Sequence, residues 1–182
     1  MNKKNNNISD VRSRQYPYIK RYKSEPGEAV ITDHAKTTGG VDTDPFHGFV
    51  IPGSKDYGVV WPFGIHYALG GYHDAPNPGD LLCAALASCL DSTIRIIAER
   101  LRIRLTFLEV DITADVDLRG TLLVDRDVSV GFQKMRCKVN LEAEDGTDPK
   151  LIQRLLKASE HSCVNMQTLL SGISIETSLN GN

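Results

Sequence analysis

The stretch 77-NPGDLLCAALASCLDSTIRIIAERL-101 decides how the rest of the chain is interpreted. Asn77 is a favourable N-cap residue, and Pro78 suits the first position of a helix because its backbone lacks the N–H that would be left without a helical acceptor there. Asp80 places a negative charge in the first turn, where it favours the helix dipole. The segment therefore predicts a helix from Asn77 to about Leu101, almost uncharged in its first half.

Two cysteines lie in this helix, Cys83 and Cys89. They point about 240° apart around the helix with a rise of roughly 9 Å between them, so they cannot form a disulfide while the helix is intact. Free cysteine is among the residue types most often buried, which favours a packing role for each thiol taken alone. The alternative is that one of them is a reactive thiol kept away from bulk water. The neighbours of Cys89 on its helix face are Leu82, Ala85, Leu86, Ser92, Thr93 and Ile96.

The segments after this helix alternate between strand and helix patterns. Residues 108–118 alternate apolar and polar side chains, which predicts a half-buried strand. Residues 127–144 predict a second strand, and its apolar phase slips by one residue at Gln133 and Lys134, which predicts a bulge. Asp148-Pro149 then begins a second helix with an expected break near residues 161–163.

Short strands are expected at residues 28–35 and 172–177, one before and one after these elements. The resulting order of strands, helix, strands, helix and strand predicts an α+β fold with antiparallel sheet packed against two apolar helices. Cys137 lies in the apolar phase of the second long strand and Cys163 on the apolar face of the second helix, so packing is again the simplest role for each thiol taken alone.

The chain is long enough for one sizeable domain, which we place at residues 17–182. Residues 1–16 are rich in Asn and Lys and are expected to be a disordered tail. Residues 44–76 are rich in aromatic residues, Gly and Pro and form a long insertion, with possible short strands around 49–51 and 58–61. A loop of this length either covers a functional pocket or serves as a core-covering or dimer-contact segment.

The composition argues against several classes of protein. A net charge of −2, with Lys and Arg spread along the chain, gives no argument for a nucleic-acid partner. No apolar stretch is expected to approach the roughly 20 residues that span a bilayer, and the N-terminus lacks the apolar core of a secretory signal. A cytoplasmic location without membrane attachment is therefore expected, with the four cysteines as thiols rather than disulfides.

Metal and hydrolase chemistry have no motif in this sequence. The cysteines show no C-x-x-C spacing and the five histidines are scattered, so neither a metal nor another cofactor is expected. The G-x-S-x-G motif of serine hydrolases is absent.

The string NPGDLLCAALASC, followed by a second helix containing SEHSCVNMQTL, resembles the OsmC/organic hydroperoxide resistance family over roughly residues 28–179. The resemblance implies an intertwined homodimer with each active site at the subunit interface and the two cysteine helices sandwiched between sheets. It also implies thiol peroxidase activity on organic hydroperoxides, as part of an oxidative stress response. By position, Cys89 corresponds to the peroxidatic thiol and Cys163 to the resolving thiol, which a dithiol reductant restores, lipoyl-type in some members.

One position departs from the pattern of the family. Peroxidase members hold an activating Arg with a Glu in the motif N-P-E, and here the motif reads N-P-G, with Gly79 in place of the Glu. Arg14 and Arg21 are N-terminal candidates for the activating Arg, and Arg95 lies on another face of the cysteine helix. Two alternatives to the peroxidase therefore stay open: a binding protein that holds a small hydrophobic ligand in the interface pocket, and a purely structural dimer.

Overall fold

The structure is a computed structural model that describes residues 11–38 and 44–179. The chain divides into two compact units, each assembled from separate stretches of sequence. The first unit comprises Met1–Ala84 and Thr113–Arg136, and the second comprises Ala85–Ile112 and Cys137–Asn182. Helix α2 (Pro78–Arg100) and strands β4 (Leu105–Asp115) and β5 (Lys134–Ala143) contribute residues to both units.

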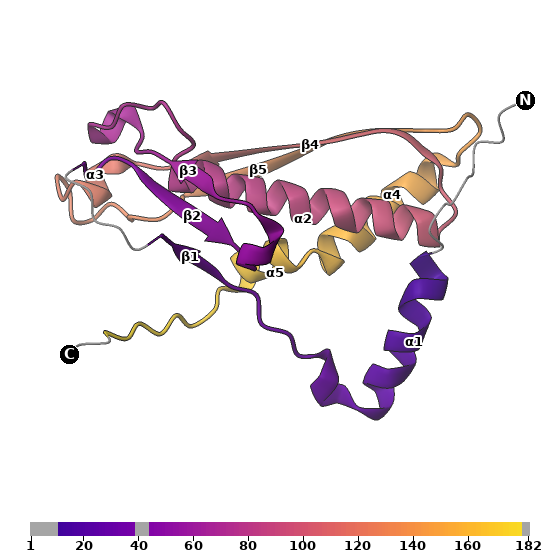
Figure 1. The fold of residues 1–182 in the computed structure, drawn as a ribbon. Coiled ribbons are helices and arrows are strands. Elements are labelled where there is room, and N and C mark those ends of the chain that lie inside the picture. Colours follow the sequence, from indigo (N-terminus) through magenta and orange to yellow (C-terminus); the bar gives the residue numbers. More distant parts are fainter. Residues whose placement is uncertain (1–10, 39–43, 180–182) are drawn as a thin grey trace, which may run out of the picture. The chain divides into compact units, whose positions relative to one another are not determined.

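The first unit contains a three-stranded antiparallel sheet in the order β1-β2-β3 (Figure 1). Its strands are β1 (Ala35–Thr37), β2 (Gly48–Pro52) and β3 (Trp61–Phe63). Lys36 of β1 pairs with Ile51 of β2, and Phe49 of β2 pairs with Pro62 of β3. Pro62 has no N–H to donate, which a strand at the edge of a sheet tolerates. Residues 44–76 also contain the short 3-10 helices η2 (Lys55–Tyr57) and η3 (Tyr67–Leu69).

The start of α2 belongs to the first unit and confirms the capping pattern of the sequence. Asn77 Oδ1 accepts the N–H groups of Gly79 at 2.8 Å and Asp80 at 3.2 Å. In return, Asp80 Oδ2 accepts the backbone N–H of Asn77 at 2.9 Å and its side-chain amide at 2.6 Å. Because both partners satisfy backbone groups at the helix end, Asn77 and Asp80 form a reciprocal capping box. The helix therefore begins where the sequence predicts.

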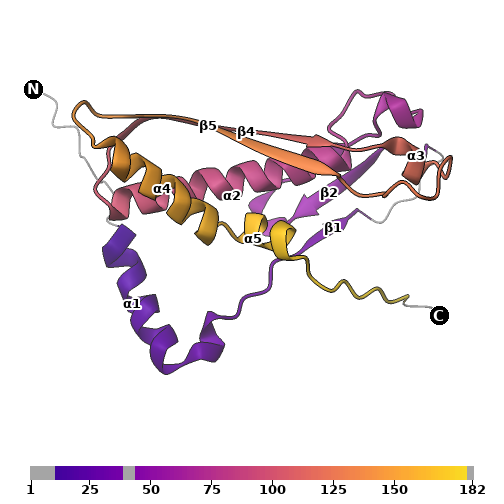
Figure 2. The same ribbon diagram turned by 180° about the vertical axis from the view of Figure 1, so that it is seen from behind.

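The second unit consists of the rest of α2, most of β4 and β5, and helices α4 (Pro149–Ser162) and α5 (Val164–Ser171), which meet at a sharp bend (Figure 2). The β4-β5 pair is antiparallel, since Arg104 O accepts the N–H of Glu144 while Glu109, further along β4, contacts Asn140. The buried apolar side chains among the described residues all belong to this unit. They are Leu86, Leu90, Ile94, Ala98, Ile103, Leu155 and Cys163, accompanied by the buried Ser159.

The predicted α+β class with antiparallel sheet is thus confirmed, as are α2, the helix after Asp148 and its break at Cys163. Strands β2 and β3 confirm the two short strands expected in the 44–76 loop, to within a few residues. The alternation in β4 holds from Leu108 to Asp115, where even-numbered side chains are the more buried ones.

Strand β4 has the predicted length but lies three residues earlier than predicted, and β5 is shorter than predicted; in both cases the reason is local. After Asp115 the chain forms the short helix α3 (Leu118–Thr121), because Asp117 accepts the N–H of Arg119 at 3.0 Å and caps a helical turn. On the other side, β5 begins only at Lys134. The phase slip at Gln133 and Lys134 therefore marks the beginning of the strand, and the predicted bulge is wrong.

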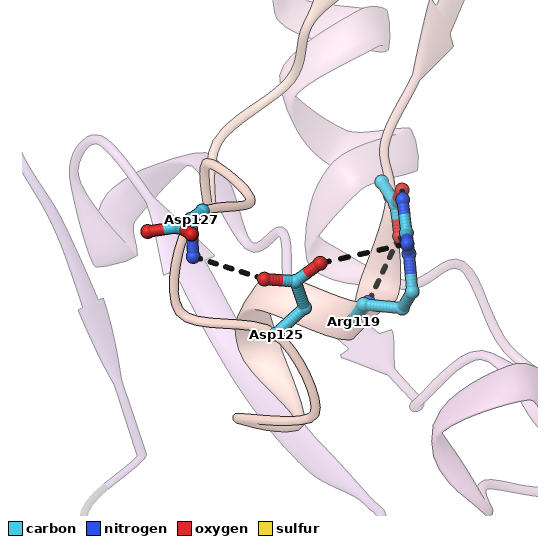
Figure 3. A network of polar contacts seen from close by, with 4 residues as sticks. Arg119, Asp125 and Asp127 are labelled. Atoms are coloured by element: carbon cyan, nitrogen blue, oxygen red, sulfur yellow. Dashed lines mark hydrogen bonds and ion pairs between the residues drawn. The ribbon is translucent and has the colours of Figure 1, made fainter.

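The turn between β4 and β5 is fixed by a polar network around Arg119 (Figure 3). The guanidinium pairs with Asp117 at 2.5 Å and with Asp125 at 3.6 Å. Asp125 also accepts the N–H of Asp127 at 3.1 Å. Leu123 adopts a positive φ of 58° in this turn, a conformation that non-glycine residues enter only where the surrounding contacts impose it.

Three predictions at the ends of the chain are wrong. Residues 11–16, expected in a disordered tail, are helical and belong to α1 (Val11–Ser24), while residues 1–10 lie outside the described residues. Residues 28–35 hold the end of the 3-10 helix Pro26–Ala29 and only the first residue of β1. Residues 172–177 form neither a helix nor a strand and pair with no strand in the described part of the chain, and Ile175 is 83% exposed there. A β-pattern becomes a strand only where a neighbouring strand satisfies its backbone groups.

Candidate functional site

Cys89 and Cys163 lie together in the second unit. Cys89 is half-buried on α2, and Cys163 is the residue at which α4 ends and α5 begins. Its extended backbone (φ −76°, ψ 109°) breaks the helix, while its N–H still donates to Ser159 O at 2.9 Å. The Cys89 thiol is close enough to Cys163 to interact with it by hydrogen bonding and charge. The fold thus brings together two thiols that are far apart in the sequence.

The surroundings of Cys163 keep it protonated. Burial raises the pKa of the Cys163 thiol, whose residue is 0% exposed, and the neighbouring Cys89 raises it further. The backbone N–H groups of Met166 and Asn165 act in the opposite direction on this pKa, although no well-formed capping hydrogen bond reaches the sulfur. The balance is a raised pKa, so Cys163 is a thiol with two N–H groups facing the position where negative charge would develop.

Side-chain hydrogen bonds to backbone carbonyls surround both cysteines. Asn165 Nδ2 donates to Ala85 O on α2 at 2.7 Å, and Gln167 Nε2 donates to Glu160 O on α4 at 2.9 Å. On α2, Thr93 Oγ1 and Ser92 Oγ both donate to Cys89 O, at 2.7 and 3.0 Å. Sequence reasoning missed Asn165 and Gln167. The available signal was the amide side chains that follow Cys163 in the otherwise apolar VNMQTLL.

The other two cysteines differ from this pair. Cys83 is half-buried, and burial, followed by the nearby Asp80 carboxylate, raises the pKa of its thiol, which is consistent with a packing role. Cys137 is exposed, so its predicted place in the core is wrong. It keeps the apolar phase of β5, but β4 is its only neighbouring strand in the described chain, and this narrow sheet leaves it open to solvent.

The environment of Gly79 explains why the Glu of the family pattern does not fit here. A Cβ added to Gly79 would lie 2.9 Å from Asn77 Oδ1 and 3.0 Å from Phe132 Cζ. The first contact is with the capping group of α2 and the second is with an aromatic ring, both within the first unit. Phe132 therefore occupies the space that a longer side chain at position 79 would need.

The three arginines considered as partners of Cys89 have other positions or partners. Arg95 forms a bidentate pair with Asp91 one turn away on α2, with its Nε at 2.6 Å from the carboxylate. Arg21 pairs with Glu28, and Arg14 lies on α1, which belongs to the first unit. The ion pairs of Arg95 and Arg21 involve carboxylates and not a thiol.

The aromatic loop of the first unit holds an ion-pair cluster that sequence reasoning also missed. His47 contacts Asp44 Oδ2 through Nδ1 at 2.5 Å and Asp74 Oδ1 through Nε2 at 2.8 Å, and its ring stacks on Tyr72. Hydrogen bonding to Asp44 and then to Asp74 raises the pKa of His47, and bonding to His47 lowers the pKa of both carboxylates. Across residues 11–38 and 44–179, no group of three His, Cys, Asp or Glu side chains has a metal-binding arrangement.

Helix α2 also bears on the question of a membrane. Within the described residues it is the one helix long and apolar enough to cross a bilayer, so the prediction that no segment comes near this length is wrong. A core helix of a soluble protein passes the same test, and Leu86, Leu90, Ile94 and Ala98 of α2 are buried inside the second unit. A single such helix is weak evidence for a membrane span.

The fold and the paired cysteines define a class of α+β proteins with an apolar cysteine helix, and comparison with known proteins identifies it. The family model described as OsmC-like protein matches residues 71–178, more than half of the chain. The chain therefore belongs to the OsmC-like family. No match is found among curated protein sequences.

Solved structures of this family share the fold. An OsmC-like protein from Mycoplasma pneumoniae has a TM-score of 0.62 at 13% identity, with 78% of this chain and 89% of that chain covered. An organic hydroperoxide resistance protein from Elizabethkingia anophelis has a TM-score of 0.56 at 18% identity, with 79% and 91% covered. An organic hydroperoxide resistance protein OsmC from Legionella pneumophila has a TM-score of 0.51 at 21% identity, with 77% and 90% covered.

Proposed function

We propose that this OsmC-like protein is a thiol-dependent peroxidase that reduces organic hydroperoxides through Cys89 and Cys163. The observation that carries the proposal is that these two thiols, one on α2 and one at the α4–α5 break, lie near enough for Cys89 to raise the pKa of Cys163, beside the buried side chains of the second unit. Two structurally similar proteins are described as organic hydroperoxide resistance proteins, which supports the same activity here.

The proposed oxidation of the two cysteines has two steps. The Cys89 thiolate attacks the terminal oxygen of the hydroperoxide, the O–O bond breaks, and the alkoxide takes a proton to leave as an alcohol. Cys89 is then a sulfenic acid. The Cys163 sulfur attacks the Cys89 sulfur and displaces hydroxide, which leaves as water once it takes the proton of the Cys163 thiol. A dithiol reductant then returns both residues to thiols.

The order of the two cysteines follows from their exposure. Cys89 is half-buried and accessible to a small molecule, whereas Cys163 is 0% exposed and its pKa is raised by burial. A hydroperoxide therefore meets Cys89 first, and Cys163 meets only the product formed on its neighbour.

The same proposal includes a homodimer as the functional state. The outer face of α2 carries small side chains at Ala85, Ser88 and Ser92, followed by Ile96, and all four are exposed. A face of small residues lets another helix approach closely, and an apolar exposed helix is an energetic liability for a monomer in water.

Three observations favour a second candidate function, the binding of a small hydrophobic ligand without catalysis. The activating Glu of the family pattern is absent, Phe132 occupies the space beside Gly79, and Arg95 and Arg21 are engaged with carboxylates. Without a cation, burial disfavours a thiolate.

Thiol titration after exposure to cumene hydroperoxide separates the two functions. Peroxidase activity predicts that the wild type loses two thiols per chain, that Cys89→Ser loses none, and that Cys163→Ser accumulates a sulfenic acid that dimedone traps. Cys83→Ser is the matched control on the same helix and should behave as the wild type. Equal thiol counts before and after hydroperoxide would reject the peroxidase, and native mass spectrometry would then test for a bound apolar ligand.

A further inference from the structure

Asn165 contacts the backbone next to both cysteines of the second unit. Its side-chain amide donates to Ala85 O at 2.7 Å, which joins α5 to α2 across 80 positions of sequence. Ala85 lies four residues before Cys89, so in a regular helix the same carbonyl also accepts the N–H of Cys89. Asn165 is therefore attached directly to the helical turn that presents the Cys89 sulfur.

The other end of the same residue faces Cys163. The backbone N–H of Asn165, together with that of Met166, lies near the Cys163 sulfur in the first turn of α5. Only two carbons, Cβ and Cγ, separate the Cα of Asn165 from its side-chain amide nitrogen. The hydrogen bond to Ala85 O therefore leaves the backbone of Asn165 little freedom to move. One half-buried residue thus couples the position of the Cys163 sulfur to the position of the turn carrying Cys89.

Disulfide formation depends strongly on such coupling. The two sulfurs must come to about 2.05 Å with a Cβ–S–S–Cβ dihedral near 90°, and small displacements of either backbone slow the step or strain the product. Cys163 lies at the break between two helices: its N–H donates to Ser159 O in α4 and its C=O accepts the N–H of Gln167 in α5, both at 2.9 Å, so its position depends on how both helices are held.

We propose that Asn165 is a positioning residue that holds the Cys163 sulfur in reach of Cys89 and thereby sets how readily the two form a disulfide. This role rests on the proposed peroxidase for its biological step, in which the Cys163 thiol attacks the Cys89 sulfenic acid, forms the S–S bond and releases water. The positioning itself concerns only the two sulfurs and can be measured without a hydroperoxide.

Gln167 supplies the matched control. Its side-chain amide also donates to a backbone carbonyl, Glu160 O, at 2.9 Å, and it too lies on α5. That bond joins α5 to α4 and does not reach the cysteine helix. Replacing either residue therefore removes one hydrogen bond of a similar kind. Only the Asn165 variant loses a hydrogen bond to α2.

The experiment measures the Cys89–Cys163 disulfide in glutathione redox buffers, in a protein whose Cys83 and Cys137 are replaced by serine. We expect Asn165→Ala to lower the effective concentration of the two thiols about fivefold, the factor for one neutral hydrogen bond, and Gln167→Ala to leave it unchanged. Asn165→Asp has the same shape but no N–H to donate, and an acidic residue suits the first turn of α5, so it keeps the helix and should reproduce the loss. After cumene hydroperoxide, both Asn165 variants should trap more sulfenic acid with dimedone than the Gln167 variant.

Two outcomes overturn the inference. One is an equal effective concentration in the Asn165 and Gln167 variants, whether both fall or neither does, because the role of Asn165 is then only structural. The other is a wild-type pair that forms no disulfide in oxidised glutathione. Failure of the proposed peroxidase gives a different result: the glutathione series still separates Asn165 from Gln167, while hydroperoxide leaves every thiol unreacted.

Discussion

The two units of this protein are stabilised in different ways. In the second unit, α2 and α4 supply fully buried side chains such as Leu90, Ile94 and Leu155. In the first unit, the most evident contacts are polar and close to the surface, around Asn77, His47 and Arg119. Burial of apolar surface is worth about 25 cal/mol per Å², whereas exposed ion pairs contribute little. Cys89 and Cys163 thus lie in the unit that holds the buried apolar side chains, and the pH-sensitive contacts of His47 lie in the other.

The largest effect should come from the interior of the second unit. Ile94 is 0% exposed, and we expect Ile94→Ala to lower the free energy of unfolding by about 2–5 kcal/mol because it removes buried methyl groups and leaves a cavity. Leu101→Ala is the control, directly after α2 at 39% exposed and outside the face proposed for the dimer, and should cost clearly less. Urea denaturation of both variants measures the difference. Equal losses would mean that burial at Ile94 adds nothing to stability.

The second-largest effect on stability should come from a substitution in the first unit, at the start of α2. Gly79→Glu forces a side chain against Phe132 and Asn77, and we expect a loss of about 1–3 kcal/mol in the free energy of unfolding, typical of an overpacked site. In a Phe132→Ala background the same change should cost less, because the ring is gone. Denaturation of the four proteins gives the coupling between the two positions. Additive losses would show that Phe132 does not exclude the Glu.

A smaller and pH-dependent effect is expected at His47. Its pKa is raised in the folded state, so its stabilising contribution is complete below its unfolded pKa of about 6.5 and is lost as the pH rises through the folded value. The pKa values of Asp44 and Asp74 are lowered, so their contribution is present above about 3.9 and is lost as the pH falls through their folded values. The gap in melting temperature between the wild type and His47→Gln should therefore be widest from about pH 4 to 6.5.

NMR titration of the His47 ring gives a direct check of its raised pKa. A His47 pKa at or below that of an unperturbed histidine would contradict the cluster. A melting-temperature gap that widens above pH 7 would contradict the sign.

The smallest effect should come from Arg119 in the turn after β4. The Arg119 and Asp125 side chains are exposed and that of Asp117 is partly exposed, so solvent screens the pairs, and we expect Arg119→Ala to change the melting temperature by little more than the experimental error. Protease cleavage at the 117–127 turn is the more sensitive measurement, since the network fixes the shape of that turn (Figure 3). A large loss of stability would mean that polar contacts stabilise the first unit more than exposure implies.

The sequence correctly predicted the elements that depend on contacts between neighbours in the chain. Asn77, Pro78 and Asp80 specify the start of α2 because capping involves neighbours in the chain, and the period of two in β4 follows from alternation in any half-buried strand. Local signals were misleading where a partner was needed. Ile173 and Ile175 have a β-pattern but no strand to pair with in the described chain, and the polar α1 is helical although it buries no residue.

By itself, the sequence determined the cysteine helix, the break at Cys163, the α+β class and the family resemblance, all of which depend on spacing along a short stretch or on a recognisable motif. Only the tertiary structure decided that Cys163 lies beside Cys89, that Asn165 binds the turn before Cys89, and that Phe132 fills the space beside Gly79. Contacts between residues so distant in the chain leave no periodic trace in the sequence, because they depend on how packed elements meet and not on the conformation of either element alone.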